Sequence, residues 1–251
     1  MDTDGKIKVV LLGAYGKTGY EVVKMIDNER GDCFELVATV DKRDEAQFKE
    51  LSEYDGEADV IIDFSHHSIT NKITEYATRK NVPLVIATTA HTDEELQMLH
   101  KAAETLPVFI AANLSVAVVL LTETAKRFAR LYEGSDVEII EKHHNRKPDA
   151  PSGTALMMAN EIKDVRPDAE FVFGRSGERE KKRNEIGIHS IRLSNSISDH
   201  EIIIANESQT ITLGHQVFDS KIYADGALSA AAYIVKQSPG IYGMAELLSN
   251  Y

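Results

Sequence analysis

Cysteine is almost missing from this chain, and the shortage excludes two common ways of stabilising a fold. The single cysteine, Cys33, cannot form an internal disulfide, and no second cysteine is present to share a thiolate metal site. We therefore interpret Cys33 as a small hydrophobic residue, buried or half-buried. No histidine spacing typical of a metal site occurs either, so we expect no metal centre.

Long apolar runs are missing as well. The longest, such as Val116 to Leu121, fall far short of the roughly 20 residues that a membrane-spanning helix needs. The first residues also lack the charged and apolar regions of a signal peptide. These shortages predict a soluble, cytoplasmic protein with no membrane partner.

Basic residues are in deficit, because 28 Lys and Arg stand against 40 Asp and Glu and the net charge is −12. A chain this acidic binds nucleic acid poorly unless its cations gather on one face, so we expect no nucleic-acid partner. The chain has 251 residues, 43% of them hydrophobic. That is enough for a sizeable core in one or two domains.

Strand-like and helix-like segments alternate in the first part of the chain. Strands are expected at 7–12, 34–40, 59–63, 83–87 and 107–111, and helices at 18–28, 68–80 and 93–105. Continuous β-branched runs such as Ile7–Leu12 are typical of strands buried on both faces. The alternation predicts an α/β domain at residues 1–114, with a Rossmann-type, doubly wound parallel sheet that binds a dinucleotide.

The pattern changes after residue 115, where several strands follow one another without helices between them. We expect helices at 115–132, 154–163, 226–235 and 241–248, and strands at 136–142, 186–193, 201–205, 209–213 and 217–223. Successive strands indicate a mixed or antiparallel sheet. We therefore predict an α+β domain for substrate binding and oligomerisation at residues 115–221, with the C-terminal helices at 222–251 packing back onto the first domain.

A glycine-rich loop follows the first expected strand and opens the first helix. It consists of Gly13, Ala14, Tyr15, Gly16, Lys17 and Thr18, followed by Gly19. In a dinucleotide-binding loop, Gly13 would allow the tight turn, Gly16 would let a pyrophosphate approach the backbone, and Gly19 would let helix and strand pack closely. A plain structural turn is the alternative.

An acidic residue, Asp41, follows the second expected strand. A carboxylate at this place can bind the ribose hydroxyls of NADH, whereas Lys17, Lys42 or Arg43 could meet the 2′-phosphate of NADPH. Because both signs of charge are present, the sequence leaves open whether the cofactor is NADH or NADPH. The alternative for Asp41 is a turn cap.

Chemically active side chains are concentrated in residues 138–154, which read EIIEKHHNRKPDAPSGT. His143, His144, Arg146 and Lys147 supply proton carriers and positive charge, and residues 152–154 open an expected helix whose free N–H groups favour an anion. A site that binds a small polyanion and moves a proton needs these parts. A solvated basic loop is the alternative.

The same stretch carries a family resemblance. Residues 141–155 match the pattern E-x-H-H-x-x-K-x-D-A-P-S-G-T-A of the dihydrodipicolinate reductase family, and the resemblance extends over almost the whole chain. Further similarities occur at 63–65, 87–89, 111–116, 185–187 and 223–227. The chain departs from the family pattern at Ala87, where glycine is usual, at Leu114, where an aromatic residue is usual, and at Ser220, where arginine is usual.

The resemblance implies reduction of 4-hydroxy-tetrahydrodipicolinate (dihydrodipicolinate) to tetrahydrodipicolinate by NADH or NADPH, a step of lysine and diaminopimelate biosynthesis. It implies that His143 and Lys147 carry protons, that His144 contacts the substrate, a small dicarboxylate, and that Gly153 and Thr154 hold a carboxylate. It also implies a homotetramer built through the second sheet. The nicotinamide is expected against two strand ends, at Ala87, Thr88, Thr89, Ala111, Ala112, Asn113 and Leu114.

Other polar groups have simpler interpretations. His66 and His67 are solvated loop residues or border the cofactor, and His189, His200 and His215 are structural or exposed. The basic run at 179–183 is a solvated mobile loop or a lid over an anion. Two alternative functions stay open: a catalytically silent NAD(P)-binding sensor, and a dehydrogenase of another small amino dicarboxylate.

Overall fold

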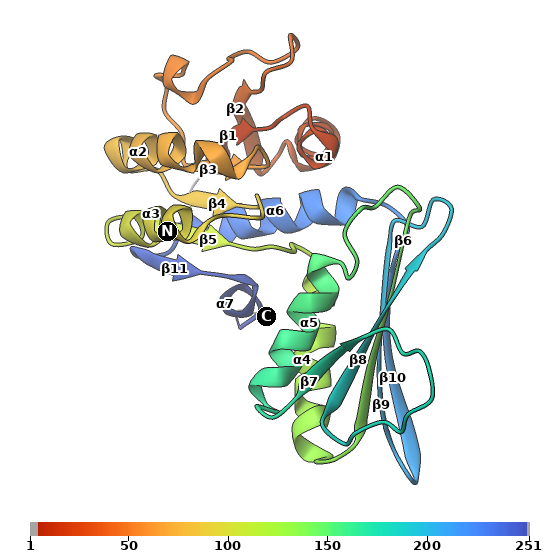
Figure 1. Ribbon diagram of the computed structural model, residues 1–251. Helices are drawn as coiled ribbons and strands as arrows, with labels where there is room; N and C mark the ends of the chain where they lie inside the picture. Colours follow the sequence, from red (N-terminus) through yellow and green to blue (C-terminus); the bar gives the residue numbers. More distant parts are fainter. Residues whose placement is uncertain (1–4, 250–251) are drawn as a thin grey trace. The chain divides into compact units, whose positions relative to one another are not determined.

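Two compact units make up the protein in a computed structural model that describes residues 5–249 (Figure 1). The first unit comprises the chain up to Ser115 and again from Ser220, and the second comprises Val116–Asp219. Within the described residues, no helix has the length and apolar character to span a membrane.

The first unit is built on a six-stranded parallel sheet with the order β11-β5-β4-β3-β1-β2. Its strands are β1 (Ile7–Leu12), β2 (Phe34–Val40), β3 (Val60–Asp63), β4 (Leu84–Ile86), β5 (Pro107–Ile110) and β11 (Gly240–Tyr242). Every residue of β3 and β4 is buried, as expected of central strands covered on both faces. The strand order reverses direction between β1 and β3, and open α/β sheets bind ligands at such a switch point.

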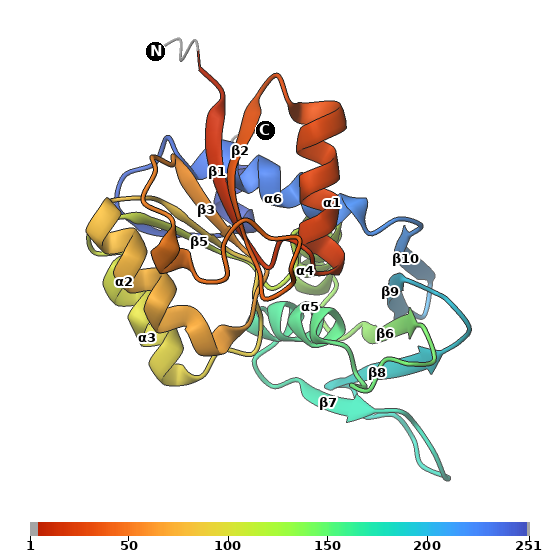
Figure 2. The ribbon, with the colours of Figure 1, turned by 90° about the horizontal axis from the view of Figure 1, so that it is seen from above.

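Helices cover both faces of this sheet. The helices α2 (Thr70–Lys80) and α3 (Asp93–Ala102) lie on one face, and α1 (Lys17–Met25) and α6 (Lys221–Ile234) lie on the other (Figure 1, Figure 2). A short helix, α7 (Met244–Leu248), follows β11. Helices on both faces of a parallel sheet confirm the doubly wound, Rossmann-type arrangement that the sequence predicts.

Three local expectations in this unit are wrong. The segment 241–248 is not one helix, because Gly240–Tyr242 pair with β5 as β11 before α7 begins. The segment 217–223 is not a strand, because α6 begins at Lys221. Cys33 is exposed rather than buried. β11 forms because it pairs with β5, and its three residues are too few to show the alternation that predicts a strand.

The second unit has a five-stranded mixed sheet with the order β10-β9-β6-β8-β7. Its elements are α4 (Val116–Leu131), β6 (Asp136–His143), α5 (Gly153–Asp164), β7 (Glu170–Phe173), β8 (Glu185–Arg192), β9 (Ser198–Asn206) and β10 (Gln209–Val217). β6 runs parallel to β8 and antiparallel to β9. The helices α4 and α5 pack side by side over one face (Figure 1).

Alternation along β6 decides which of its side chains enter the core. Val137 and Ile139 are fully buried and pack in one cluster with Met158 and Ile162 of α5. The buried positions continue at every second residue to Glu141 and His143. Because side chains of a strand alternate between faces, these two polar residues lie on the same sheet face as the apolar core.

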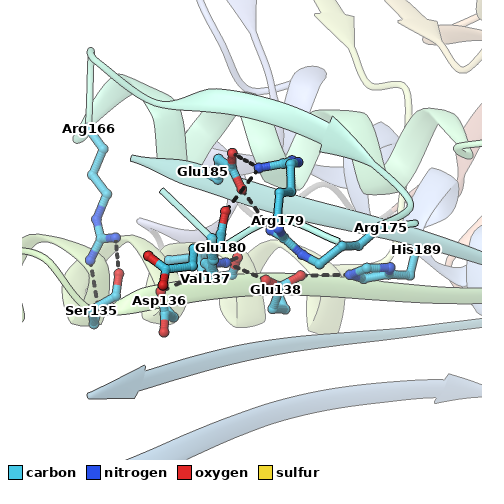
Figure 3. Close-up of polar contacts among 11 residues, drawn as sticks. Ser135, Asp136, Val137, Glu138, Arg166, Arg175, Arg179, Glu180, Glu185 and His189 are labelled. Atoms are coloured by element: carbon cyan, nitrogen blue, oxygen red, sulfur yellow. Dashed lines mark hydrogen bonds and ion pairs between the residues drawn. The ribbon is translucent and has the colours of Figure 1, made fainter. Parts of the chain in front are cut away.

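The basic loop before β8 is held against its own sheet. Arg175 and Arg179 bind the buried carboxylate of Glu185 at 2.7 and 2.6 Å, and their hydrogen bonds lower the pKa of Glu185 to about 2 (Figure 3). Lys181 binds Glu138, which also accepts a bond from His189 at 2.6 Å. Arg175, Arg179 and Lys181 of this loop are therefore paired with carboxylates, unlike the cations of a solvated basic loop.

Candidate active site

The glycine loop after β1 is a tightly packed turn. Gly13 adopts φ +70°, and a Cβ there would lie 2.5 Å from the carbonyl oxygen of Phe64. A Cβ at Gly19 would lie 2.1 Å from the carbonyl oxygen of Gly13. Both contacts are too short for any side chain, so these two glycines allow β1, α1 and the segment after β3 to approach one another.

Gly16 begins α1 without a side chain that could cap it. It is the N-cap residue in extended conformation, and no side chain bonds the N–H groups of the first turn. Unbonded N–H groups at a helix N-terminus form an anion site. This observation fits the pyrophosphate of a dinucleotide.

A cavity of about 1080 Å³ lies beside this turn. Its lining includes Gly13, Gly16, Asp41 and Lys42, and further cations contributed by Arg43, Lys49, Lys72 and Arg79. The volume suits a large ligand, and the cations would offset the phosphate charge that the acidic chain otherwise repels. The residues present therefore fit the adenosine and phosphate part of NADH or NADPH.

Asp41 ties the end of β2 to the glycine loop. Its carboxylate accepts the backbone N–H groups of Tyr15 at 3.0 Å and of Arg43 at 3.1 Å, and the Arg43 guanidinium donates to the Tyr15 carbonyl. Asp41 therefore caps a turn, which is the alternative role that the sequence left open for it. Each carboxylate oxygen can accept a second bond, so a ribose hydroxyl can still bind here.

A second cavity, of about 360 Å³, adjoins the ends of β3 and β4. Its lining comprises Phe64, Ser65, His66, His67, Ala87, Thr88, Thr89 and Ala90, of which Phe64, Ser65 and His66 also line the larger cavity. Three of the expected nicotinamide contacts, Ala87, Thr88 and Thr89, are therefore brought next to the loop after β3. Because they share these residues, the two cavities are neighbours at the carboxyl ends of the strands.

Buried Asp63 organises the hydroxyl groups at this smaller cavity. Its carboxylate accepts the backbone N–H of Ser65 at 2.9 Å, the hydroxyl of Thr88 at 2.7 Å and the hydroxyl of Ser65. Burial raises the pKa of the Asp63 carboxyl, and the bonds from Ser65 and Thr88 oppose that shift. The contacts hold both hydroxyl groups in place at the cavity.

The histidines after β3 are at the smaller cavity and are not merely solvated. His67 binds Glu95 at 2.9 Å, and the same carboxylate caps the N-terminus of α3 through Thr92. His66 accepts the backbone N–H of Ser68 at 3.2 Å. Since both histidines line the cavity, the alternative in which they border the cofactor is the one that the geometry favours.

The remaining expected cofactor residues line neither cavity. Ala14, Ala111, Asn113 and Leu114 are buried, whereas Tyr15, Lys17, Thr18 and Ala112 reach the surface. Leu114, which departs from the family pattern, packs directly against α6. A Cβ at Gly226 of that helix would lie 2.0 Å from the carbonyl oxygen of Leu114. Ser220, another departure, precedes α6 as its N-cap residue.

In the second unit, His143 ends β6 and is joined to a buried carboxylate. His143 Nδ1 lies 2.5 Å from Glu141 Oε2. Arg192 donates two bonds to the same carboxylate, at 2.9 Å to Oε2 and 2.8 Å to Oε1. Burial would raise the pKa of Glu141, but hydrogen bonds from His143, Arg192 and Ser190 lower it to about 2. Glu141 is therefore a fixed anion beside His143.

The N-terminus of α5 begins beside the same carboxylate. The backbone N–H of Ser152 donates to Glu141 Oε1 at 3.2 Å, and the Ser152 hydroxyl caps the helix by accepting the N–H of Ala155 at 3.2 Å. Gly153 is the first residue of α5, is exposed, and has open space where a Cβ would lie. Thr154 follows it in the first turn, where backbone N–H groups favour an anion.

Lys147 and His144 lie in the loop between β6 and α5. The ammonium of Lys147 binds Asp149 at 2.8 Å, and both His144 and Lys147 are half-buried. The Asp149 carbonyl accepts a bond from Arg192, so the loop is fastened to the strand β8. All five residues expected at the substrate, His143, His144, Lys147, Gly153 and Thr154, lie between the end of β6 and the first turn of α5.

Three further side chains belong to this site and were missed in the sequence. Glu141 could have been found, since it precedes His143 by two residues and shares its strand face. Arg192 and His200 could not, because only sheet pairing aligns Arg192 with His143 and His200 with Glu141. Within residues 5–249, no group of three or more His, Cys, Asp and Glu is arranged to hold a metal ion.

Comparison with known proteins identifies the family. The model of the dihydrodipicolinate reductase N-terminus matches residues 7–114, and that of its C-terminus matches residues 117–248. The protein named 4-hydroxy-tetrahydrodipicolinate reductase in Caldanaerobacter subterraneus subsp. tengcongensis is 40% identical over 97% of this chain and 99% of its own length. Its namesake in Clostridium novyi is 38% identical over 97% and 98%.

A solved structure agrees with these matches. Dihydrodipicolinate reductase from Paenisporosarcina sp. TG-14, solved with dipicolinate bound, superposes with a TM-score of 0.77 at 30% identity, over 96% of this chain and 99% of that one. A diaminopimelate dehydrogenase of C. glutamicum shares the fold at 15% identity and a TM-score of 0.59. With both halves matched in sequence and the whole chain matched in structure, the protein belongs to the dihydrodipicolinate reductase family.

Proposed function

We propose that the protein is a 4-hydroxy-tetrahydrodipicolinate reductase that works through His143, Lys147 and the N-terminus of α5. In the reaction the ring loses its hydroxyl together with a neighbouring ring hydrogen as water, and it gains a hydride from NADH or NADPH and a proton, which gives tetrahydrodipicolinate. The observation that carries the residue roles is the buried Glu141–His143 contact of 2.5 Å beside the start of α5. A proton carrier next to an anion site is what this reaction needs, and the contact supports the proposed roles.

The first unit supplies the cofactor site in this proposal. Gly13, Ala14, Tyr15, Gly16, Lys17 and Thr18 form the pyrophosphate site, in which the N–H groups of Lys17 and Thr18 at the start of α1 are the donors. Asp41 lies at the ribose, with Lys42 nearby. The nicotinamide lies against Ala87, Thr88, Thr89, Ala111, Ala112, Asn113 and Leu114. When bound, the cofactor supplies the hydride. Cations around the larger cavity and the carboxylate of Asp41 support use of both NADH and NADPH.

The second unit supplies the substrate site. A carboxylate of the substrate binds at Gly153 and Thr154, since the N-terminus of α5 attracts an anion. His144 contacts the substrate, and the ammonium of Lys147 polarises the ring nitrogen. Dipicolinate, bound by the relative from Paenisporosarcina sp. TG-14, is a small dicarboxylate of the same kind.

His143 transfers the proton in the reduction. An imidazole can both donate and accept a proton, and the buried carboxylate of Glu141 lies 2.5 Å from Nδ1 of this ring. Lys147 is the second proton donor. Its ammonium pairs with Asp149 at 2.8 Å.

We also propose where the enzyme works and how it assembles. We expect a cytoplasmic homotetramer that binds neither nucleic acid nor membranes, with the second sheet as the contact between subunits. A biosynthetic reductase whose cofactor and substrate are small soluble molecules needs no other partner. Native mass spectrometry and cell fractionation test these two points.

A coupled assay tests the activity. Dihydrodipicolinate synthase generates the substrate in the assay, and the oxidation of NADH or NADPH is followed by its absorbance. Turnover with both cofactors is expected. Binding of NADPH without oxidation would indicate a silent sensor, and oxidation with another amino dicarboxylate alone would indicate a different dehydrogenase.

A further inference from the structure

We propose that Glu141 and Arg192 form a positioning pair that sets the geometry of both His143 and the N-terminus of α5. The inference rests on the proposed function, because it assigns these two residues a role in the same proton transfer. Neither side chain is required to touch the substrate. Each acts through a group that the proposed reaction uses.

The Glu141 carboxylate is fully occupied. Oε1 accepts Arg192 Nη2 at 2.8 Å and the Ser152 N–H at 3.2 Å, and Oε2 accepts Arg192 Nη1 at 2.9 Å and faces His143 Nδ1 at 2.5 Å. The side chain has no exposed surface. Ser190 donates a further hydrogen bond to it. A carboxylate with these contacts and no access to water holds its neighbours in place and does not itself exchange protons with a ligand.

The contact with Glu141 selects one tautomer of His143. An ionised carboxylate only accepts hydrogen bonds, so His143 Nδ1 must carry a hydrogen. The proton that His143 gains and loses is then on Nε2, the opposite nitrogen of the ring. The rings of His143 and His200 meet edge to face with centroids 5.4 Å apart, which restricts rotation of the imidazole.

The same carboxylate also sets the start of α5. Ser152 is the N-cap residue of that helix, and its N–H is held by Glu141 Oε1. Gly153 and Thr154 follow directly. Glu141 bonds His143 through Oε2 and the Ser152 N–H through Oε1. This one side chain therefore sets the distance between the imidazole of His143 and the start of α5, where the substrate carboxylate binds.

Arg192 extends the arrangement to the second proton donor. Besides its two bonds to Glu141, Arg192 donates to the backbone carbonyl of Asp149. The side-chain carboxylate of Asp149 pairs with Lys147 at 2.8 Å. In the sheet, Arg192 lies opposite His143 in the parallel register of β6 and β8. A guanidinium is suited to this place because its planar fork bonds both carboxylate oxygens at once.

Two variants and a matched control test the pair. Glu141→Gln removes the charge but preserves the size, and Arg192→Lys preserves the charge but loses the fork. Glu138→Gln is the control, because Glu138 lies on the same strand, points to the opposite face, and also bonds a histidine, His189 at 2.6 Å. Circular dichroism first establishes that each purified variant is folded.

The readouts separate positioning from general stability. In Glu141→Gln, kcat with the synthase-generated substrate is expected to fall by about 10²-fold, with a smaller decrease in Arg192→Lys. The dissociation constant of NADPH stays at the wild-type value in both. Imidazole ¹⁵N shifts of histidine-labelled protein, with His143→Gln for assignment, are expected to show Nδ1–H alone for His143 in the wild type and a mixture of tautomers in Glu141→Gln.

The outcomes that overturn the inference are distinct from failure of the proposed function. Wild-type kcat and an unchanged His143 tautomer in Glu141→Gln would refute the pair, as would an equal loss in Glu138→Gln. The ¹⁵N spectra need no substrate. If the wild-type enzyme fails to oxidise NADPH, the proposed function is lost, and the tautomer of His143 in wild type and Glu141→Gln still decides whether Glu141 positions it.

Discussion

Ser152 Oγ and His200 Nε2 lie 3.3 Å apart, and this contact joins the N-terminus of α5 to the strand β9. His200 is almost completely buried, and burial, together with the nearby charge of His143, lowers its pKa to about 4. The imidazole is therefore neutral at neutral pH. The network around the helix start depends on a histidine that must stay uncharged in the folded protein.

Acid should destabilise the protein through His200. Because the pKa falls from 6.5 to about 4 on folding, the unfolded chain binds the proton first, and the free energy of unfolding decreases as pH falls from about 6.5 to about 4. The loss is on the order of 3 kcal/mol. Urea unfolding at pH 7, 5.5 and 4.5 measures it.

The matched variants are His200→Gln and His100→Gln, the second at an exposed histidine of α3. The decrease between pH 7 and 4.5 should be smaller in His200→Gln than in the wild type, and unchanged in His100→Gln. An identical decrease in all three proteins would mean that His200 does not control the acid response. Glu141 contributes at lower pH, because its pKa is about 2.

Removal of the proton carriers should slow the reaction. His143→Gln and Lys147→Ala are each expected to lower kcat by about 10²-fold or more, because general acid catalysis is lost. Binding of NADPH should change little. Lys142→Ala is the control, because Lys142 alternates to the opposite face of β6. Wild-type turnover in both catalytic variants would contradict the assigned roles.

Asp41→Ala should weaken binding of NADH more than binding of NADPH, because only NADH offers a free 2′-hydroxyl to the carboxylate. Fluorescence titration of each cofactor measures the two dissociation constants. Asp44→Ala is the control, since that side chain is exposed and bonds only Lys49 among the contacts described. Equal weakening of both cofactors would mean that Asp41 acts only through the N–H groups of Tyr15 and Arg43.

Gly19→Ala should destabilise the first unit and reduce cofactor binding. The new Cβ would lie 2.1 Å from the carbonyl oxygen of Gly13, so α1 must move away from the turn, at a cost of about 1–3 kcal/mol. Thermal unfolding and NADPH titration measure both effects. Gly214→Ala, where a Cβ meets open space, should leave them unchanged, and an equal effect there would exclude crowding at Gly19 as the cause.

Much of the fold could be predicted from local pattern. The strands β1 and β2 were predicted with the bounds observed, because a run of β-branched apolar residues such as Ile7–Leu12 has one favourable environment, the interior of a sheet. The strand β7 (Glu170–Phe173) was not predicted. Its four residues are too few to carry a period, and pairing with β8 decides their conformation.

The sequence by itself determined the family, the order of the two sheets and the loop that carries His143 and Lys147, because these depend on residues that are close along the chain. Only the tertiary structure decided that Arg192 and His200, which lie about 50 residues further along, meet Glu141 and Ser152. The physical reason is strand register: β8 and β9 flank β6, and hydrogen bonding between strands aligns side chains that no local pattern relates.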